Sequence, residues 1–525
     1  MKAHLLFEDA DFDVGGELPP NHEDLTRDLE LSTLLLAMAG EDGFLYDVSQ
    51  RVLLASVTEP EVILHRQRVL SDCIAHPEVI RELYDLSVDA IEDRRSIWGG
   101  YGGSYRTPRS SLAGAVSHLE AYIGRLRQLR QIADERLPLF ESEGLRKLLS
   151  TLRGALSDEY FDEVDEHLKR LKFRSGMLIS AELDRDNSGI NFVLRASEAT
   201  GASWRHRLGL GSRSSLSFTV PSRDDAGIQV IQDLTNRGIN LVANAAAQSA
   251  DHLKSYFTML RFELGFYVSC LNLWHRLEEK GVPCSFPLAA TCGVRAFTCT
   301  DLRDVCLALR SDDAVTGNDV DADERTLVIV TGANSGGKST FLRSSGTAQL
   351  MLQCGLFVTA RSFRADLVRG VFTHFAREED RSMTSGRFDE ELSRMSETVD
   401  QLHPDCLILF NESFAGTNEL EGSEIARQIV RALLEARTKV FYVTHRFDFA
   451  ASFFESRTDS MLFLRADRMP DGRRNFKLVV GEPLVTSFGE DLYYRLGPWL
   501  DEDQQTTSAR PRSRRGVAGE TPGDP

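Results

Sequence analysis

Residues 331–340 read TGANSGGKST, and from Gly332 to Ser339 they fit the pattern G-x-x-x-x-G-K-[ST]. The preceding run, Thr326–Val330, is typical of a buried strand, and Thr340–Leu352 is typical of a helix. Between a strand and a helix, such glycines let backbone N–H groups surround phosphates at the positive end of the helix. The stretch therefore predicts a P-loop. Its candidate nucleotide contacts are Gly332, Ala333, Asn334, Ser335, Gly336, Gly337, Lys338, Ser339 and Thr340.

Two further strands predict the chemistry of this site. Lys338 would reach the β- and γ-phosphates of ATP, and Ser339 would coordinate Mg²⁺. The run Cys406–Phe410 ends in Asn411 and Glu412, where a carboxylate can polarise the attacking water. We therefore expect Lys338 and Glu412 to be catalytic, and Ser339 to hold the metal.

A third strand, Val440–Thr444, ends at His445. A histidine there could hydrogen-bond the γ-phosphate or the attacking water. Taken alone it is more often a structural residue at a strand end. Its position after the other two motifs favours the functional interpretation, so His445 is the third candidate catalytic residue.

Four segments resemble the ATPase domain of the MutS family over about residues 325–500. TGANSGGKSTFLRS is similar to its Walker A stretch, and LILFNESFAGTNELEGSEIA to its Walker B stretch with the Gly416-Thr417 and Glu421-Gly422 steps. VTHRFDFA is similar to its Thr-His motif, and EPLVTSFGEDLYYRLG to its Ser-Tyr-Gly segment. Upstream, LASVTEPEVILHRQRVLSDC is similar to the beginning of the MutS core domain.

The resemblance implies an ABC-type ATPase that dimerises through its nucleotide domains. A signature loop from the partner then completes each site, and here that loop is Ser385, Gly386 and Arg387, followed by Phe388, Asp389 and Glu390. It also implies that the ATP state opens or closes lever arms around DNA.

The chain departs from the family pattern in three ways. Asn411 stands where the family has the Walker B Asp; an amide can hold a Mg²⁺-bound water but lacks the charge, so we expect slow hydrolysis. The signature loop lacks the Ser-Thr-Phe step, which leaves Ser385 as the nearest hydroxyl. We also expect neither the N-terminal mismatch-reading domain nor a C-terminal nuclease-like extension.

The first hundred residues read as mostly helical, up to the glycine-rich segment 98–105, which is either a linker or a nucleic-acid contact. Beyond it, two seams of apolar residues at spacings of three and four predict two long helices. These would form either an outgoing and returning arm or a simple bundle. The first seam is Leu112, Val116, Leu119, Ile123 and Leu126; the second is Leu253, Phe257, Leu260, Leu264, Tyr267, Leu271 and Trp274.

The runs MLISAEL, INFVLRA and LSFTV between the seams predict a small β module at about residues 175–225. Arg205, Arg207 and Arg213 lie in it and are the candidate contacts to DNA phosphates. A solvated loop is the competing interpretation.

The predicted fold is multidomain: a mostly α-helical core and lever region with a small β module, followed by an α/β P-loop domain of ABC type. We expect the N-terminal part of the helical core at 1–110 and the levers with their clamp-like module at 111–300. The ATPase domain would occupy 301–500, and the arginine-containing tail 501–525 would be disordered.

Composition limits the function further. The net charge of −18 over 525 residues gives no overall basic field, so DNA contact needs a local basic patch. The start, MKAHLLFEDADFD, does not resemble a secretory signal, and no apolar run is long enough to span a membrane. Eight scattered cysteines without a C-x-x-C pair indicate reduced thiols in a cytoplasmic protein.

The leading hypothesis is a MutS-related, homodimeric DNA-binding ATPase that uses ATP and Mg²⁺ in DNA repair or recombination. It would recognise DNA by shape and backbone. The alternative is a nucleotide-gated interaction protein with little turnover and no direct DNA role. A third possibility, another ABC-type chromosome ATPase, is disfavoured because no long coiled-coil insert separates Walker A from the signature loop.

Overall fold

The computed structural model describes residues 2–98, 107–174, 176–186, 189–195, 219–221, 223–333, 336–377, 386–469 and 474–484. As the sequence predicts, the first hundred residues are mostly helical, and helices continue as far as Leu171. The elements are α1 (His22–Asp28), α2 (Leu31–Ala39), α3 (Gly43–Leu53), α4 (Pro60–Ala75), α5 (Pro77–Trp98), α6 (Pro108–Arg136), η1 (Leu137–Leu139), α7 (Glu143–Ala155) and α8 (Asp158–Leu171).

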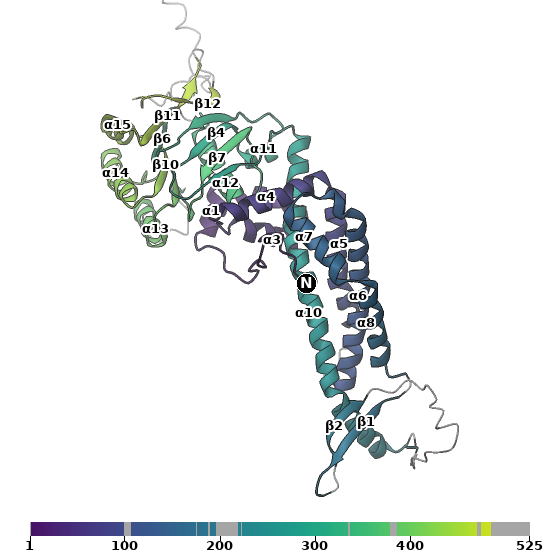
Figure 1. Cartoon of the computed structure of the whole chain (residues 1–525). Helices are drawn as coiled ribbons and strands as arrows, with labels where there is room; N and C mark the ends of the chain where they lie inside the picture. Colours follow the sequence, from purple (N-terminus) through teal and green to yellow (C-terminus); the bar gives the residue numbers. More distant parts are fainter. Residues whose placement is uncertain are drawn as a thin grey trace, which may run out of the picture.

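A long arm leaves the strand-containing part of the molecule (Figure 1). Its main helix, α10 (Asp225–Glu279), has 55 residues. At 1.5 Å per residue it is about 80 Å long. Helices α5 and α6 pack along it. Both predicted seams are helical, and side chains such as Leu126 and Leu260 are fully buried. The two interpretations therefore combine, because the arm is itself a helical bundle.

The far end of the arm carries the antiparallel pair β1 (Leu178–Leu183) and β2 (Gly189–Arg195) (Figure 1). These two strands confirm the first two predicted β runs. The third run, LSFTV, is not a strand in its described residues 219–220, and 216–218 lie outside the described residues.

The N-terminal segment is bound to the arm through buried polar side chains. Glu263 of α10 accepts a hydrogen bond of 2.6 Å from the backbone N–H of Leu5 and a longer one from Leu6. The Tyr267 hydroxyl donates to the Leu5 carbonyl at 2.7 Å, and Arg66 Nε donates to the Leu6 carbonyl at 2.8 Å. All three side chains are buried, so the segment is part of the core.

The strands after residue 287 form two sheets. The four-stranded sheet has the order β3-β7-β4-β5, and the six-stranded sheet has the order β12-β11-β6-β10-β9-β8. Every pair in the larger sheet is parallel except β11 with β12. The strands are β3 (Leu288–Ala290), β4 (Phe297–Leu302), β5 (Asn318–Asp321), β6 (Leu327–Thr331), β7 (Ser362–Asp366), β8 (Val371–Phe375), β9 (Leu407–Asn411), β10 (Lys439–Val443), β11 (Met461–Arg468) and β12 (Arg474–Val480).

Side chains alternate across a strand, and both faces of the larger sheet are covered. Leu327 and Ile329 of β6 belong to one apolar cluster, whereas Val328 and Val330 belong to the other. The first cluster includes residues of α14 and α15, and the second includes residues of α12. Burial on both faces explains why these strands are continuous apolar runs. The helices of this part are α11 (Val305–Arg310), α12 (Lys338–Gln353), α13 (Arg387–Gln401), α14 (Glu419–Glu435) and α15 (Phe447–Glu455).

Two other sequence predictions concern thiols and membranes. All eight cysteines lie in described residues and are free thiols. Within the described ranges, no helix combines the length and apolar character needed to cross a bilayer.

Candidate nucleotide-binding site

The predicted strand, loop and helix around residues 326–353 are present as β6, a connecting loop and α12. Gly332 and Gly337 have left-handed φ values of 106° and 88°, which favour glycine. A Cβ on Gly332 would lie 2.8 Å from the Ala466 backbone nitrogen, so only hydrogen fits there. The described loop residues therefore have the conformation that their glycines predict, whereas Asn334 and Ser335 lie outside the described residues.

Lys338 begins α12 and is buried, with its side chain folded over the loop. Its ammonium donates to the carbonyls of Gly332 at 2.9 Å and Ala333 at 3.0 Å. Burial lowers the pKa of Lys338, although the Glu412 carboxylate opposes that effect. The cation is thus held by loop carbonyls, which phosphate oxygens could replace as hydrogen-bond acceptors.

Ser339 and Asn411 approach each other across the carboxyl ends of β6 and β9. The Ser339 hydroxyl donates to Asn411 Oδ1 over 2.9 Å. Thr340 follows in the first turn of α12. A hydroxyl and an amide oxygen at this spacing are ligands that Mg²⁺ accepts, because Mg²⁺ takes few protein oxygens and completes its shell with water and phosphate. The donor set therefore fits a Mg²⁺–nucleotide complex.

Glu412 and His445 also meet, although they follow different strands. The ring Nδ1 of His445 makes a short contact with Glu412 Oε2, and the His445 backbone N–H donates to the same oxygen at 3.3 Å. This hydrogen bond raises the pKa of His445, and partial burial opposes the rise. A carboxylate oriented by an imidazole at a strand end could accept a proton from water.

The predicted signature residues are only partly described. Gly386 precedes α13 as its N-cap and Arg387 begins the helix, with its Nε 3.7 Å from Glu391 Oε1. The start of α13 touches the loop after β9, because a Cβ on Gly416 would lie 2.9 Å from the Phe388 nitrogen. Ser385 lies outside the described residues, and so do the candidate DNA contacts Arg205, Arg207 and Arg213.

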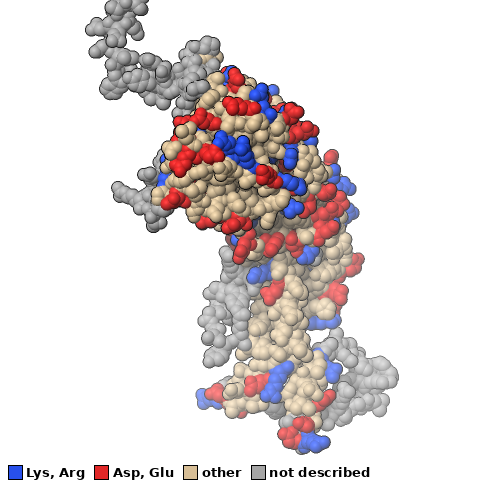
Figure 2. Space-filling model, turned by 90° about the vertical axis from the view of Figure 1, so that its left-hand side faces the viewer, with Lys and Arg blue, Asp and Glu red and all other residues tan. Residues whose placement is uncertain are grey.

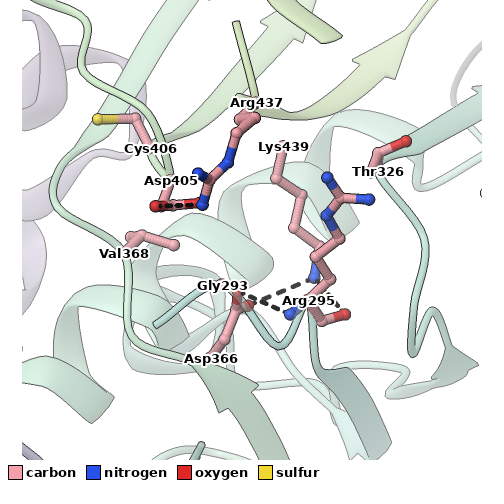
Figure 3. A pocket seen from close by; sticks show the side chains of 9 residues that line it. All are labelled: Gly293, Arg295, Thr326, Asp366, Val368, Asp405, Cys406, Arg437 and Lys439. Carbon is pink, nitrogen blue, oxygen red and sulfur yellow. Dashed lines mark hydrogen bonds and ion pairs between the residues drawn. The ribbon is translucent and has the colours of Figure 1, made fainter. Parts of the chain in front are cut away.

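A cavity shown in Figure 3 lies at the opposite edge of the sheet, by the amino ends of β6, β9 and β10. Its volume is about 10 Å³, which suits one water molecule. The Lys439 ammonium there donates to the carbonyls of Arg295 and Ala296, 3.5 Å from Asp366 Oδ1. Burial lowers the pKa of Lys439 and raises that of Asp366. This cavity is a structural ion-pair site, separate from the candidate nucleotide site.

Sequence reasoning missed Arg446, which follows His445. Its guanidinium donates to the carbonyls of Glu419 at 3.3 Å and Thr417 at 3.4 Å. A Cβ on Gly422 would lie 2.0 Å from Arg446 Nη1, so this glycine makes room for the arginine. An Arg directly after the Thr-His pair was the available signal.

Sequence reasoning also missed His374 and Ser413, which bond to each other beneath the site. A histidine inside the otherwise apolar, β-forming run VFTHF was the only signal.

Comparison with known proteins identifies two regions. A sequence model described as the MutS2 N-terminal domain matches residues 58–280, and one described as MutS domain V matches residues 328–485. The second region contains the converging residues Lys338, Ser339, Asn411, Glu412 and His445.

Individual relatives match over shorter stretches. The chain is 34% identical over 142 residues to DNA mismatch repair protein MutS of Porphyromonas gingivalis, covering 26% of this chain and 16% of that protein. It is 33% identical over 125 residues to DNA mismatch repair protein MutS of Thermus aquaticus, covering 24% and 15%. It is 31% identical over 125 residues to Endonuclease MutS2 of Streptococcus equi subsp. equi, covering 24% and 16%. The matches thus span less than a fifth of each of these three relatives, but together with the two matched domains they show that the chain belongs to the MutS family.

Proposed function

We propose that this protein is an ATP- and Mg²⁺-dependent DNA-binding ATPase that acts as a dimer in DNA mismatch repair or recombination. The observation that carries the proposal is the convergence of Lys338, Ser339, Asn411, Glu412 and His445 at the carboxyl edge of one parallel sheet. Ligands of open parallel α/β sheets bind at this edge. The names of the MutS relatives supply the DNA-related part of the proposal.

Each residue has a separate role in this proposal. Lys338 would exchange its loop carbonyls for the β- and γ-phosphates, with the backbone of residues 332–340 around them. Ser339 and Asn411 would hold Mg²⁺, which neutralises phosphate charge when it is bound. Glu412 would orient and deprotonate the attacking water, and His445 would hold Glu412 in place. Because Asn411 contributes no charge, turnover would be slow.

The regions of the chain would divide the work. Residues 301–500 would form the ATPase domain, residues 111–300 the levers with a clamp-like module, and residues 1–110 part of the helical core. In a dimer, Ser385, Gly386 and Arg387 of each subunit would approach the nucleotide of the other. Closure at the nucleotide would then move the arms toward DNA.

DNA contact would depend on local basic features, because the net charge of −18 gives no overall basic field. Figure 2 shows Lys and Arg interspersed with Asp and Glu over the described residues of the strand-containing part. The candidate contacts are therefore Arg205, Arg207 and Arg213. If these three residues bind phosphates, the log of the binding constant should fall with log salt at a slope of about −3 per arm.

The test is ATP hydrolysis by the purified protein alone and with linear, mismatched or four-way-junction DNA, with Lys338→Ala as control. Turnover that DNA stimulates and that Lys338→Ala abolishes is the expected result. Absence of salt-sensitive binding to all three DNA forms would refute the DNA role.

A second function is favoured by Asn411. Without the Asp charge, ATP could act as a conformational ligand that gates a protein interaction with little turnover. ATP binding without hydrolysis or a DNA response would support it, and Asn411→Asp would then restore turnover. Robust hydrolysis that Glu412→Gln abolishes would exclude this alternative.

A further inference from the structure

Three buried polar residues lie beneath the candidate site. His374 belongs to β8, Ser413 follows Glu412 directly, and Glu391 belongs to α13. The exposed fractions of these residues are 0%, 2% and 0%. Side chains buried to this degree usually have hydrogen-bond partners, and His374 and Ser413 find each other.

His374 bonds in two directions. Its ring Nδ1 lies 2.9 Å from the Ser413 hydroxyl, and its Nε2 lies 3.0 Å from the backbone carbonyl of Glu391. A carbonyl only accepts, so Nε2 carries the hydrogen. Burial lowers the pKa of His374 to about 4. At neutral pH the ring is therefore uncharged, and the one hydrogen of the Ser413 hydroxyl is shared between two acceptors, ring Nδ1 and the His374 backbone carbonyl.

The turn around Ser413 needs such support. Glu412 and Phe414 on either side of it have left-handed φ values of 54° and 62°, which are unfavourable for residues other than glycine. The Phe414 ring stacks on His374 with centroids 5.2 Å apart, and the Tyr442 hydroxyl donates to the Ser413 carbonyl at 3.1 Å. The conformation that presents Glu412 is thus fixed by residues behind it.

We propose that His374 is a positioning residue that holds the Glu412 turn with one ring nitrogen and α13 with the other. The placement of Glu412 then depends on the placement of α13 in the same subunit. This inference rests on the proposed function, in which Glu412 serves the subunit's own nucleotide and the start of α13 serves the partner's. His374 would thereby connect the two nucleotide sites of a dimer.

A second contact joins the same two elements. The buried Glu391 carboxylate faces the Gly416 backbone N–H, whose dipole opposes the rise that burial causes in the pKa of Glu391. Gly416 also packs directly on Phe388. The loop after β9 and the start of α13 therefore meet at two places, of which His374 is the one that reaches Glu412.

The experiment uses four full-length variants. His374→Phe keeps a ring against Phe414 but loses both bonds, and His374→Gln keeps a donor near the Glu391 carbonyl. Ser413→Ala removes the hydroxyl, and with it the contacts to Nδ1 and to the His374 backbone carbonyl. Ser49→Ala is the matched control, because Ser49 is equally buried but bonds within α3.

Hydrogen exchange without nucleotide is the first readout. His374→Phe should raise exchange in peptides from both 409–416 and 387–396. Ser413→Ala and His374→Gln should raise it mainly in 409–416, and Ser49→Ala in neither. Wild-type exchange in both peptides of His374→Phe would overturn the inference. If His374→Phe does not fold, unchanged 409–416 exchange in Ser413→Ala overturns it equally.

ATP kinetics are the second readout. We expect Ser413→Ala and His374→Phe to hydrolyse ATP about tenfold more slowly, which corresponds to the loss of one hydrogen bond in the transition state, with an unchanged Kd for ATP. An unchanged rate would overturn the positioning role. If the wild-type protein binds no ATP, the proposed function fails, while the exchange readout still decides whether His374 couples the two elements.

Discussion

The substitution Glu263→Gln tests how the arm is attached to the rest of the molecule. Glu263 is fully buried in α10, and its carboxylate accepts the N–H groups of Leu5 and Leu6. Burial, which outweighs these hydrogen bonds, raises its pKa from 4.5 to about 7, and the nearby Asp11 adds to the rise. The N-terminal segment should therefore be held more tightly when Glu263 is protonated.

The sign and size follow from proton linkage. In the closed state the N-terminal segment covers Glu263, and in the open state Glu263 is exposed to water. Because the pKa of Glu263 is raised in the closed state, that state binds more protons than the open one. The stabilisation is complete below about pH 4.5 and is lost as the pH rises through about 7. The pKa of Glu263 rises by about 2.5, and a change of one in pKa corresponds to 1.36 kcal/mol. Protonation of Glu263 therefore stabilises the closed N-terminal segment by roughly 3 kcal/mol in full. Between pH 5 and pH 8 we expect the free energy of opening the segment to fall by about 2–3 kcal/mol.

Hydrogen exchange of residues 2–12 measures this free energy, because opening the segment exposes Glu263 to water. Glutamine does not titrate, so opening of the variant should lack this pH-dependent component. Comparing the two proteins at each pH cancels the intrinsic exchange rate. The difference in opening free energy between the wild type and the variant should therefore change with pH. A difference that stays constant from pH 5 to pH 8 would refute the reasoning.

Three further predictions concern the sheet edges. Lys439→Met should destabilise the protein by about 3–5 kcal/mol, because it leaves the buried Asp366 carboxylate unpaired; thermal unfolding measures this, and adding Asp366→Asn should recover part of the loss. Glu412→Gln should lower the pKa of His445 toward its ordinary value, as followed by histidine NMR. In the wild type, the Glu412–His445 contact should weaken as the pH rises through that raised pKa, and an unshifted titration in the variant would contradict the contact. Asn411→Asp should lower the Mg²⁺ concentration that half-saturates ATP binding, and calorimetry showing no change would place Asn411 away from the metal.

Pattern and motif predicted the parts of this structure that depend on local sequence. The strands before and after the P-loop follow from continuous apolar runs such as Leu327–Val330, which packing on both faces requires. The arm helices follow from seams at spacings of three and four. The glycines of the P-loop predicted left-handed backbone at their positions, and Gly332 and Gly337 have it.

Contacts between distant segments could not be predicted in this way. Glu263 lies 258 residues from Leu5, and nothing in an amphipathic helical pattern indicates which backbone its carboxylate accepts from. His374 lies in β8, and Ser413 follows shortly after the end of the adjacent parallel strand β9, so their meeting depends on the β8–β9 register. The contacts of Arg446 could not be predicted either, because it donates to backbone carbonyls, which every residue has.

Three successive residues at the end of β9 illustrate how the fold separates tasks. Asn411 faces the Ser339 hydroxyl, Glu412 contacts His445, and Ser413 bonds to His374. A regular strand would send the first and third to the same face, but the left-handed φ of Glu412 turns them apart. A nucleotide on α12 would therefore meet the first two residues and not the third. Changes at position 411 should act on the metal, changes at 412 on the chemical step, and changes at 413 on that step only through the turn that presents Glu412.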